Sequence, residues 1–176
     1  MVRVRNYLLV GCCAIVLLVL KADAEDVLFK ACDDPKGTGK LVNVNVDPCP
    51  GPGVTTGENK KKSCELIKGT KPNISITFIP ATQATNVTAK VWGIVYGKQI
   101  KYNLPNPNAC IQSGLKCPLK PKQQYTYQVA LPIYKIYPEI SVFIKWELED
   151  QDKNAIICMI IKAEIKSSKT VPGSKH

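Results

Sequence analysis

The chain has 176 residues, of which 45% are hydrophobic and 22% are charged, and its formal net charge is +10. This length accommodates one domain with a single core. The chain has one histidine, the terminal His176, which argues against Ser-His and Cys-His catalytic pairs and against a zinc site. We therefore expect neither an enzyme nor a metal or cofactor site.

Residues 1–24 have the layout of a secretory signal peptide. Arg3 and Arg5 precede an uncharged stretch from Leu8 to Leu20, and Ala22-Asp23-Ala24 provides a small-x-small cleavage site. The stretch is too short to cross a bilayer, so an uncleaved anchor is the less favoured alternative. Cleavage after Ala24 would remove three basic residues and one acidic residue and leave 152 residues with a net charge of +8.

The mature chain has an even number of cysteines. The six are Cys32, Cys49, Cys64, Cys110, Cys117 and Cys158. In a secreted chain this predicts three disulfides, although six cysteines permit fifteen pairings. The sequence alone favours a Cys110–Cys117 pair, because the short turn between them contains Gly114 and closes easily.

Short runs rich in β-branched and aromatic residues recur between Gly, Pro and Asn, and helical periodicity is almost absent. The runs predict strands at Val27 to Ala31, Leu41 to Val46, Asn73 to Ile79, Val87 to Tyr96, Gln99 to Leu104, Tyr125 to Leu131, Ile140 to Glu149 and Ala155 to Ile165. About seven such strands are typical of an immunoglobulin-like antiparallel β-sandwich, an all-β fold. Residues 167–176 are expected to form a disordered tail.

The run from Ile140 to Glu149 alternates clearly. One face carries Ile140, Val142, Ile144, Trp146 and Leu148, and the other carries Ser141, Lys145, Glu147 and Glu149. We expect the first face in the core and the second mostly in water. The following segment, Asp150 to Asn154, has the composition of a hairpin turn, with a calcium site as the less favoured alternative.

Surface features fit a secreted protein. Two sequons, beginning at Asn73 and Asn86, predict glycosylation of solvent-exposed asparagines. Lysines are scattered apart from Lys60-Lys61-Lys62, so the positive charge indicates either a solvated surface or contact with anionic membranes or an acidic partner. We expect no nucleic-acid partner, because a secreted protein rarely meets one.

The most specific pattern is a set of motifs in one fixed order. In chain order they are Cys32, Asn45-Val46-Asp47-Pro48-Cys49-Pro50, Cys64-Glu65-Leu66-Ile67-Lys68-Gly69, Val91-Trp92-Gly93-Ile94-Val95-Tyr96-Gly97, Cys110, Gly114, Cys117-Pro118, Tyr125-Thr126-Tyr127, Leu131-Pro132-Ile133, Tyr137-Pro138, Trp146-Glu147-Leu148-Glu149-Asp150 and Cys158. In this order the chain resembles the ML (MD-2-related lipid-recognition) family. The resemblance covers the domain predicted at residues 25–166 and is strongest to the secreted sterol carriers of the family.

The resemblance implies the remaining disulfides and a lipid site. It implies that Cys32 pairs with Cys158 and Cys49 with Cys64. Family residues that line a sterol pocket between the sheets match Tyr102, Ile133 and Tyr137, with tyrosine replacing the usual phenylalanine at the first position. The added hydroxyl needs a hydrogen-bond partner.

The resemblance also implies a partner surface. The family's exposed apolar hairpin, where transfer to a membrane acceptor occurs, matches Ile94, Val95 and Tyr96, and Gly93 and Gly97 would permit its turns. A buried strand is the alternative interpretation.

The function implied is that of a monomeric carrier that binds a cholesterol-like sterol and hands it to membranes or a membrane acceptor. The implied locations are the extracellular fluid and the lumen of late endosomes and lysosomes. One alternative is a carrier of fatty acids or other small hydrophobic semiochemicals, and another is an adaptor that presents a lipid to an innate-immune receptor. A lipid hydrolase ranks below both.

Overall fold

The computed structural model describes residues 29–49 and 63–168. Nine strands run through these ranges: β1 (Phe29–Ala31), β2 (Lys40–Asp47), β3 (Cys64–Ile67), β4 (Asn73–Ile79), β5 (Thr88–Val95), β6 (Lys98–Tyr102), β7 (Tyr125–Ala130), β8 (Ile140–Glu149) and β9 (Ala155–Lys166). No helix long and apolar enough to span a bilayer occurs in the described part. The predicted signal peptide, the three consecutive lysines and nearly all of the predicted tail lie outside it.

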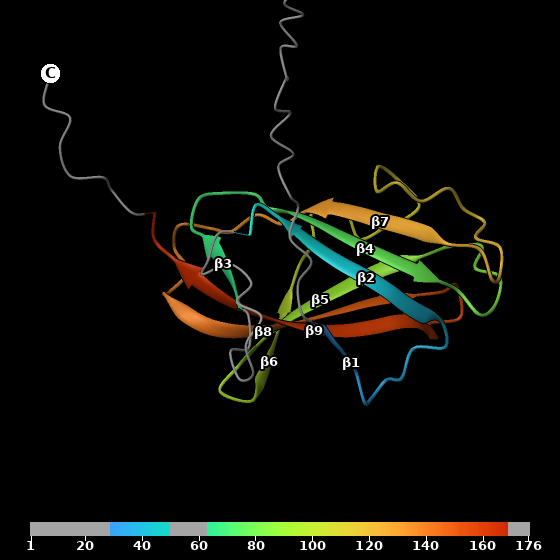
Figure 1. The fold of residues 1–176 in the computed structure, drawn as a ribbon, viewed down its shortest axis with the longest axis horizontal. Coiled ribbons are helices and arrows are strands. Elements are labelled where there is room, and N and C mark those ends of the chain that lie inside the picture. Colours follow the sequence, from blue (N-terminus) through green and yellow to red (C-terminus); the bar gives the residue numbers. More distant parts are fainter. Residues whose placement is uncertain (1–28, 50–62, 169–176) are drawn as a thin grey trace, which may run out of the picture.

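The strands form two layers (Figure 1). The large sheet has the order β1-β9-β8-β5-β6, with β3 also paired to β9, and the small sheet has the order β2-β4-β7. All pairs are antiparallel except β3 with β9, which is parallel. The predicted β-sandwich is confirmed, with nine strands rather than about seven.

The predicted boundaries of the strands match closely, and β4 and β8 match to the residue. The strand that the sequence did not predict is β3, which has four residues and pairs Cys64 with Ala163 of β9. Four residues are too few to show a period, and the partner of β3 is about a hundred residues away in the chain. Residues Cys64–Ile67 therefore form a strand because they pair with β9, and their local sequence does not predict it.

All three predicted disulfides are present. Cys32–Cys158 joins the chain just after β1 to β9, and Cys110–Cys117 closes the loop between β6 and β7. Cys49–Cys64 joins the chain after β2, in the small sheet, to the start of β3, in the large sheet. Cys32–Cys158 thus links positions 126 residues apart in the chain, and Cys49–Cys64 links the two sheets.

The core lies between the inner faces of the two sheets. Trp146 of β8 is fully buried and packs against Tyr127 of β7, with ring centroids 6.0 Å apart. The inward positions of β4 are Ile74, Ile76 and Phe78, and all three are fully buried. Of the apolar face predicted for β8, Val142, Ile144, Trp146 and Leu148 are buried as expected, and Ile140 at the start of the strand is partly exposed.

The expected solvation of the other face of β8 is confirmed for Ser141, which is exposed, and wrong for the other three residues. Lys145, Glu147 and Glu149 are 8%, 5% and 7% exposed. The reason is that β8 is a central strand between β9 and β5, and long side chains from β5 reach across its outer face. Lys90 of β5 bonds Glu149 at 2.5 Å, and the Lys145 ammonium lies 5.1 Å from the ring centroid of Trp92, also on β5.

Candidate functional site: an apolar cavity between the sheets

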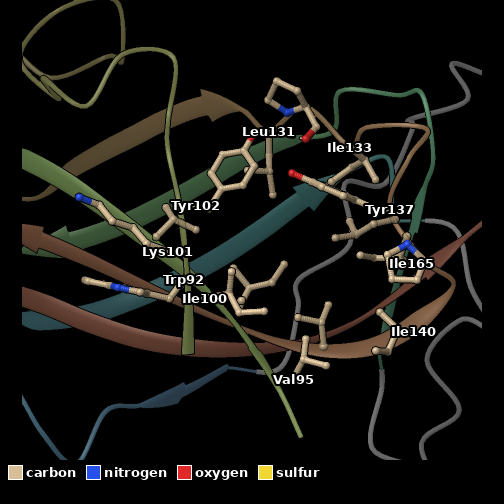
Figure 2. Close-up of a pocket in the computed structure, with 17 residues that line it drawn as sticks. Trp92, Val95, Ile100, Lys101, Tyr102, Leu131, Ile133, Tyr137, Ile140 and Ile165 are labelled. Carbon is tan, nitrogen blue, oxygen red and sulfur yellow. Dashed lines mark hydrogen bonds between the residues drawn. The ribbon is translucent and has the colours of Figure 1, made fainter. Parts of the chain in front are cut away.

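A cavity of about 270 Å³ opens at the end of the sandwich where β5 ends and β8 begins (Figure 2). Its walls come from β3, β5, β6, β8, β9 and the segment 131–138, which links β7 to β8. The lining residues are Leu66, Val91, Trp92, Gly93, Val95, Ile100, Lys101, Tyr102, Leu131, Pro132, Ile133, Tyr137, Pro138, Ile140, Val142, Ile144 and Ile165. Almost all of these side chains are apolar.

Strand alternation produces the wall made by the large sheet. Val91, Gly93 and Val95 of β5 contribute every second residue, and the register places Gly93 between Ile144 of β8 and Ile100 of β6. Side chains two apart along a strand share a face. Trp92 and Lys101 border the cavity but extend away from it (Figure 2).

Gly93 lies within β5 and not in a turn, which corrects the expectation for this residue. A Cβ atom built on Gly93 would have as its nearest neighbour Val142 Cγ2 at 3.5 Å, an ordinary van der Waals contact. The absence of a side chain here therefore leaves open space in the cavity wall.

The opposite wall is the segment 131–138. Pro132 has no N–H to continue strand pairing, and β7 ends at Ala130. Ile133 is 4% exposed and is held by two backbone hydrogen bonds: its N–H donates to Thr70 O at 2.9 Å, and Gly69 N–H donates to Ile133 O at 2.6 Å. The wall is thus fixed on one side to the connection between β3 and β4.

Tyrosine hydroxyls supply the polar groups at the mouth of the cavity. The Tyr102 hydroxyl, whose partner the sequence left open, donates to Pro132 O at 3.2 Å. Burial raises the pKa of Tyr102 well above its usual range, and the nearby Tyr134 and Tyr137 add to the effect. Burial also raises the pKa of Tyr137, whose ring meets that of Tyr134 edge-on at 5.5 Å.

The three residues predicted to bind lipid, Tyr102, Ile133 and Tyr137, come together on one cavity although they derive from β6 and the 131–138 segment. Their contact with a ligand stays a prediction. The sequence did not single out Gly93 and Ile100, among others, as lining residues. The period-2 alternation of Val91, Gly93 and Val95 shows that these residues share a face, but it does not say which end of a sandwich stays unfilled.

The predicted partner surface divides into three environments. Val95 lines the cavity and therefore differs from the prediction. Ile94 occupies the other face of β5, opposite Phe143 of β8. Tyr96 is 91% exposed and forms a two-residue turn with Gly97, and both have positive φ, 48° and 76°. Such turns match the twist of a hairpin.

The predicted glycosylation sites and the predicted hairpin turn both lie at the surface. Asn73 and Asn86 are exposed, as glycosylation would require. The Asp150 carboxylate accepts hydrogen bonds from the N–H groups of Asp152 and Asn154, each at 2.9 Å, and so closes the predicted hairpin turn. Residues 29–49 and 63–168 contain no group of three or more His, Cys, Asp or Glu side chains arranged to hold a metal ion.

Comparison with known proteins assigns the family. The family model described as the ML domain matches residues 26–165. NPC intracellular cholesterol transporter 2 homolog a of Drosophila melanogaster is 38% identical over 161 residues, which cover 92% of this chain and 99% of the relative. NPC intracellular cholesterol transporter 2 of Mus musculus is 37% identical over 150 residues, 85% of this chain and 92% of the relative.

A solved structure agrees with these sequences. The crystal structure of a Niemann-Pick type C2 protein from the Japanese carpenter ant superposes with a TM-score of 0.68 at 28% identity, covering 79% of this chain and 99% of that one. Fold, disulfides and sequence therefore lead to one conclusion: the chain belongs to the ML domain family.

Proposed function

We propose that this protein is a lipid carrier that holds a sterol in the cavity between its sheets and delivers it to membranes or to a membrane acceptor. The observation that carries the proposal is the cavity itself, an almost wholly apolar space lined by Tyr102, Ile133 and Tyr137. The similarity of the chain to relatives that are named cholesterol transporters supports a sterol as the ligand.

The energy of such binding requires no charged contact. A sterol that buries roughly 400 Å² of apolar surface gains up to about 10 kcal/mol at ~25 cal/mol/Å² before ordering and association costs are subtracted. This is enough for micromolar to nanomolar affinity. The carrier therefore needs no covalent step, and we propose no enzymatic activity.

The cavity must widen to hold a sterol. Its volume of about 270 Å³ lies just below the range of about 300 to 1,000 Å³ that is typical of small-molecule sites. An unfilled apolar cavity costs stability, so partial closure without ligand and support by a bound ligand are expected. We therefore propose that the walls move apart when a sterol enters.

Delivery requires a surface beside the mouth. Tyr96 at the tip of the β5–β6 hairpin is 91% exposed, and Ile100, which borders the cavity, is 61% exposed. Exposed apolar groups at the rim of a ligand site favour contact with a membrane or a partner protein. We propose that this hairpin makes that contact, in the extracellular fluid or in the lumen of late endosomes and lysosomes, and that the protein acts as a monomer.

Two measurements test the proposal. Mass spectrometry of lipid extracted from natively purified protein should find a sterol, whereas fatty acids or a glycolipid would favour the other carrier or the adaptor. For delivery, Tyr96→Asp should slow sterol transfer to vesicles while leaving equilibrium sterol binding within about twofold, because Tyr96 is exposed and does not line the cavity. Equal loss of binding and transfer would contradict the assignment of the hairpin.

The fatty-acid alternative would be favoured by a wide cavity that is polar at Tyr102. The Tyr102 hydroxyl already donates to Pro132 O, so this polar group is not free to bind a carboxylate. The bonded hydroxyl is the observation that speaks against a fatty acid.

A further inference from the structure

The exposed residues that line the cavity are Ile100 and Lys101 of β6 and Pro138, so the mouth lies between β6 and the segment 131–138. β6 is the edge strand of the large sheet, and the segment 131–138 connects β7 of the small sheet to β8 of the large sheet. The hydrogen bond from the Tyr102 hydroxyl to Pro132 O, at 3.2 Å, crosses from one to the other beside the cavity. Figure 2 shows the Tyr102 ring beside Leu131, with Tyr137 and Ile133 across the space.

The segment 131–138 is held differently on its two sides. Away from β6, Ile133 exchanges two backbone hydrogen bonds with Gly69 and Thr70. Toward β6, the Tyr102 side chain provides the bond to Pro132. A side chain can leave its partner by rotating about its own bonds, whereas a pair of backbone bonds breaks only when the chain moves. The mouth should therefore open on the β6 side.

The surroundings of Tyr102 make this hydrogen bond effective. The side chain is partly buried among apolar lining residues, and its hydroxyl is protonated at neutral pH like that of any tyrosine, so it is a donor. Burial together with Tyr134 and Tyr137 raises its pKa further. A hydrogen bond in partly desolvated surroundings is stronger than the same bond in water.

We infer that the bond between the Tyr102 hydroxyl and the Pro132 carbonyl is a latch that sets how fast a ligand enters and leaves the cavity. The inference rests on the proposed function, because the cavity must widen to admit a sterol. Widening on the β6 side separates Tyr102 from Pro132, and the bond forms again once the ligand is inside. Because the bond must break whenever a ligand passes between the cavity and the solvent, it limits the rate of entry as well as the rate of release.

The test is Tyr102→Phe, which keeps the ring against the cavity and removes the hydroxyl. With a fluorescent sterol in a stopped-flow instrument, association and dissociation rate constants should both rise about fivefold, the factor that corresponds to about 1 kcal/mol for one hydrogen bond. A rise in the association rate constant is the result that loss of a contact with the ligand would not produce. The matched control is Tyr125→Phe at the opposite end of β7, where the lost hydroxyl bonds Lys120 and Gln123.

Two results would overturn the latch. Unchanged rates in Tyr102→Phe would show that the bond does not limit exchange. Faster dissociation with unchanged association and weaker affinity would show that the hydroxyl bonds the ligand instead.

A second readout separates failure of the latch from failure of the proposed function. Hydrogen exchange of the ligand-free protein requires no sterol. Tyr102→Phe should speed exchange at the amides of β6 about fivefold, because β6 is the edge strand on the side that opens, and leave β9 unchanged. Exchange equal to that of the parent would reject the latch even if the parent binds sterol, and faster exchange in a protein that binds no sterol would reject the proposed ligand alone.

Discussion

The two faces of β8 follow the same alternation but carry opposite chemistry. The inner face begins with Val142 and Ile144 at the cavity and continues with Trp146 in the closed core. The outer face holds Lys145, Glu147 and Glu149, which are nearly as buried but charged. Burial of apolar side chains is favourable by itself, whereas buried charges need partners. The inner face can therefore stay stable with one region left unfilled for a ligand. The charged side chains of the outer face must each have a partner of opposite charge or a hydrogen bond.

Pairing on the outer face is uneven. Lys90 reaches Glu149 at 2.5 Å, while Lys145 lies 4.0 Å from Glu147 and also sits over Trp92. Burial raises the pKa of Glu147, the negative charge of Glu149 adds to it, and Lys145 opposes it. The other groups facing Glu147 are Lys90 across the ladder on β5 and the disulfide-bonded Cys158 on β9. We therefore expect sterol binding to be sensitive to changes of side-chain volume on the inner face. We expect the pH dependence of stability to be sensitive to changes on the outer face.

The largest effect on the inner face should come from Ile133→Trp. The larger ring would occupy the cavity, so we expect sterol binding to fall by at least about a hundredfold, while the extra volume is taken up by space that is already open. Fluorescent-sterol titration measures binding, and thermal melting checks the fold. Binding like that of the parent would place the ligand elsewhere, and failure to fold would make Ile133 ordinary core.

A smaller loss is expected when a wall is removed. Tyr137→Ala takes away a ring that borders the cavity, and the lost apolar contact should weaken sterol binding by about 1 to 3 kcal/mol. Competitive titration of parent and variant measures the difference. Tyr134→Ala is a useful control, because Tyr134 contacts Tyr137 but is not among the lining residues. Equal losses in both variants would show that packing of the pair, not contact with ligand, is responsible.

The mildest change of volume is Gly93→Ala. The added methyl group meets Val142 at an ordinary distance, so the melting temperature should change little, while the methyl intrudes on the cavity. We expect a loss of sterol affinity of about threefold to tenfold, in the range for one misplaced methyl group in an apolar pocket. Isothermal titration of both proteins gives the answer, and unchanged affinity would mean that the sterol lies away from β5.

On the outer face, Glu147→Gln should alter the pH dependence of stability. Because the folded pKa of Glu147 is raised, its contribution is fully present below the unfolded value of 4.5 and is lost as pH rises through the folded pKa. The glutamine variant should therefore gain stability relative to the parent as pH rises. Denaturant unfolding at several pH values measures this difference.

Glu164→Gln is the control for that experiment. Hydrogen bonds from Ser63 and Lys166 lower the pKa of Glu164, so its contribution is present above the unfolded value and is lost as pH falls through the folded pKa. This variant should lose stability relative to the parent as pH rises. The same sign for both variants would contradict the account of the outer face.

Local sequence patterns were sufficient to predict most of the strands and one of the disulfides. Alternation over Ile140 to Glu149 located β8 to the residue, because the period of a strand is a property of the chain itself. The short spacing of Cys110 and Cys117 was enough to favour their pairing, and the order of the motifs identified the family. The resemblance to that family then predicted Tyr102, Ile133 and Tyr137 as pocket residues, and all three line the cavity.

The tertiary structure decided what depends on neighbours far away in sequence. β3 exists because β9 pairs with it, Gly93 and Val95 line a cavity because the segment 131–138 stands opposite them, and Glu147 is buried because β5 and β9 flank its strand. Alternation tells which side chains share a face, but whether that face meets core, cavity or water depends on what packs against it.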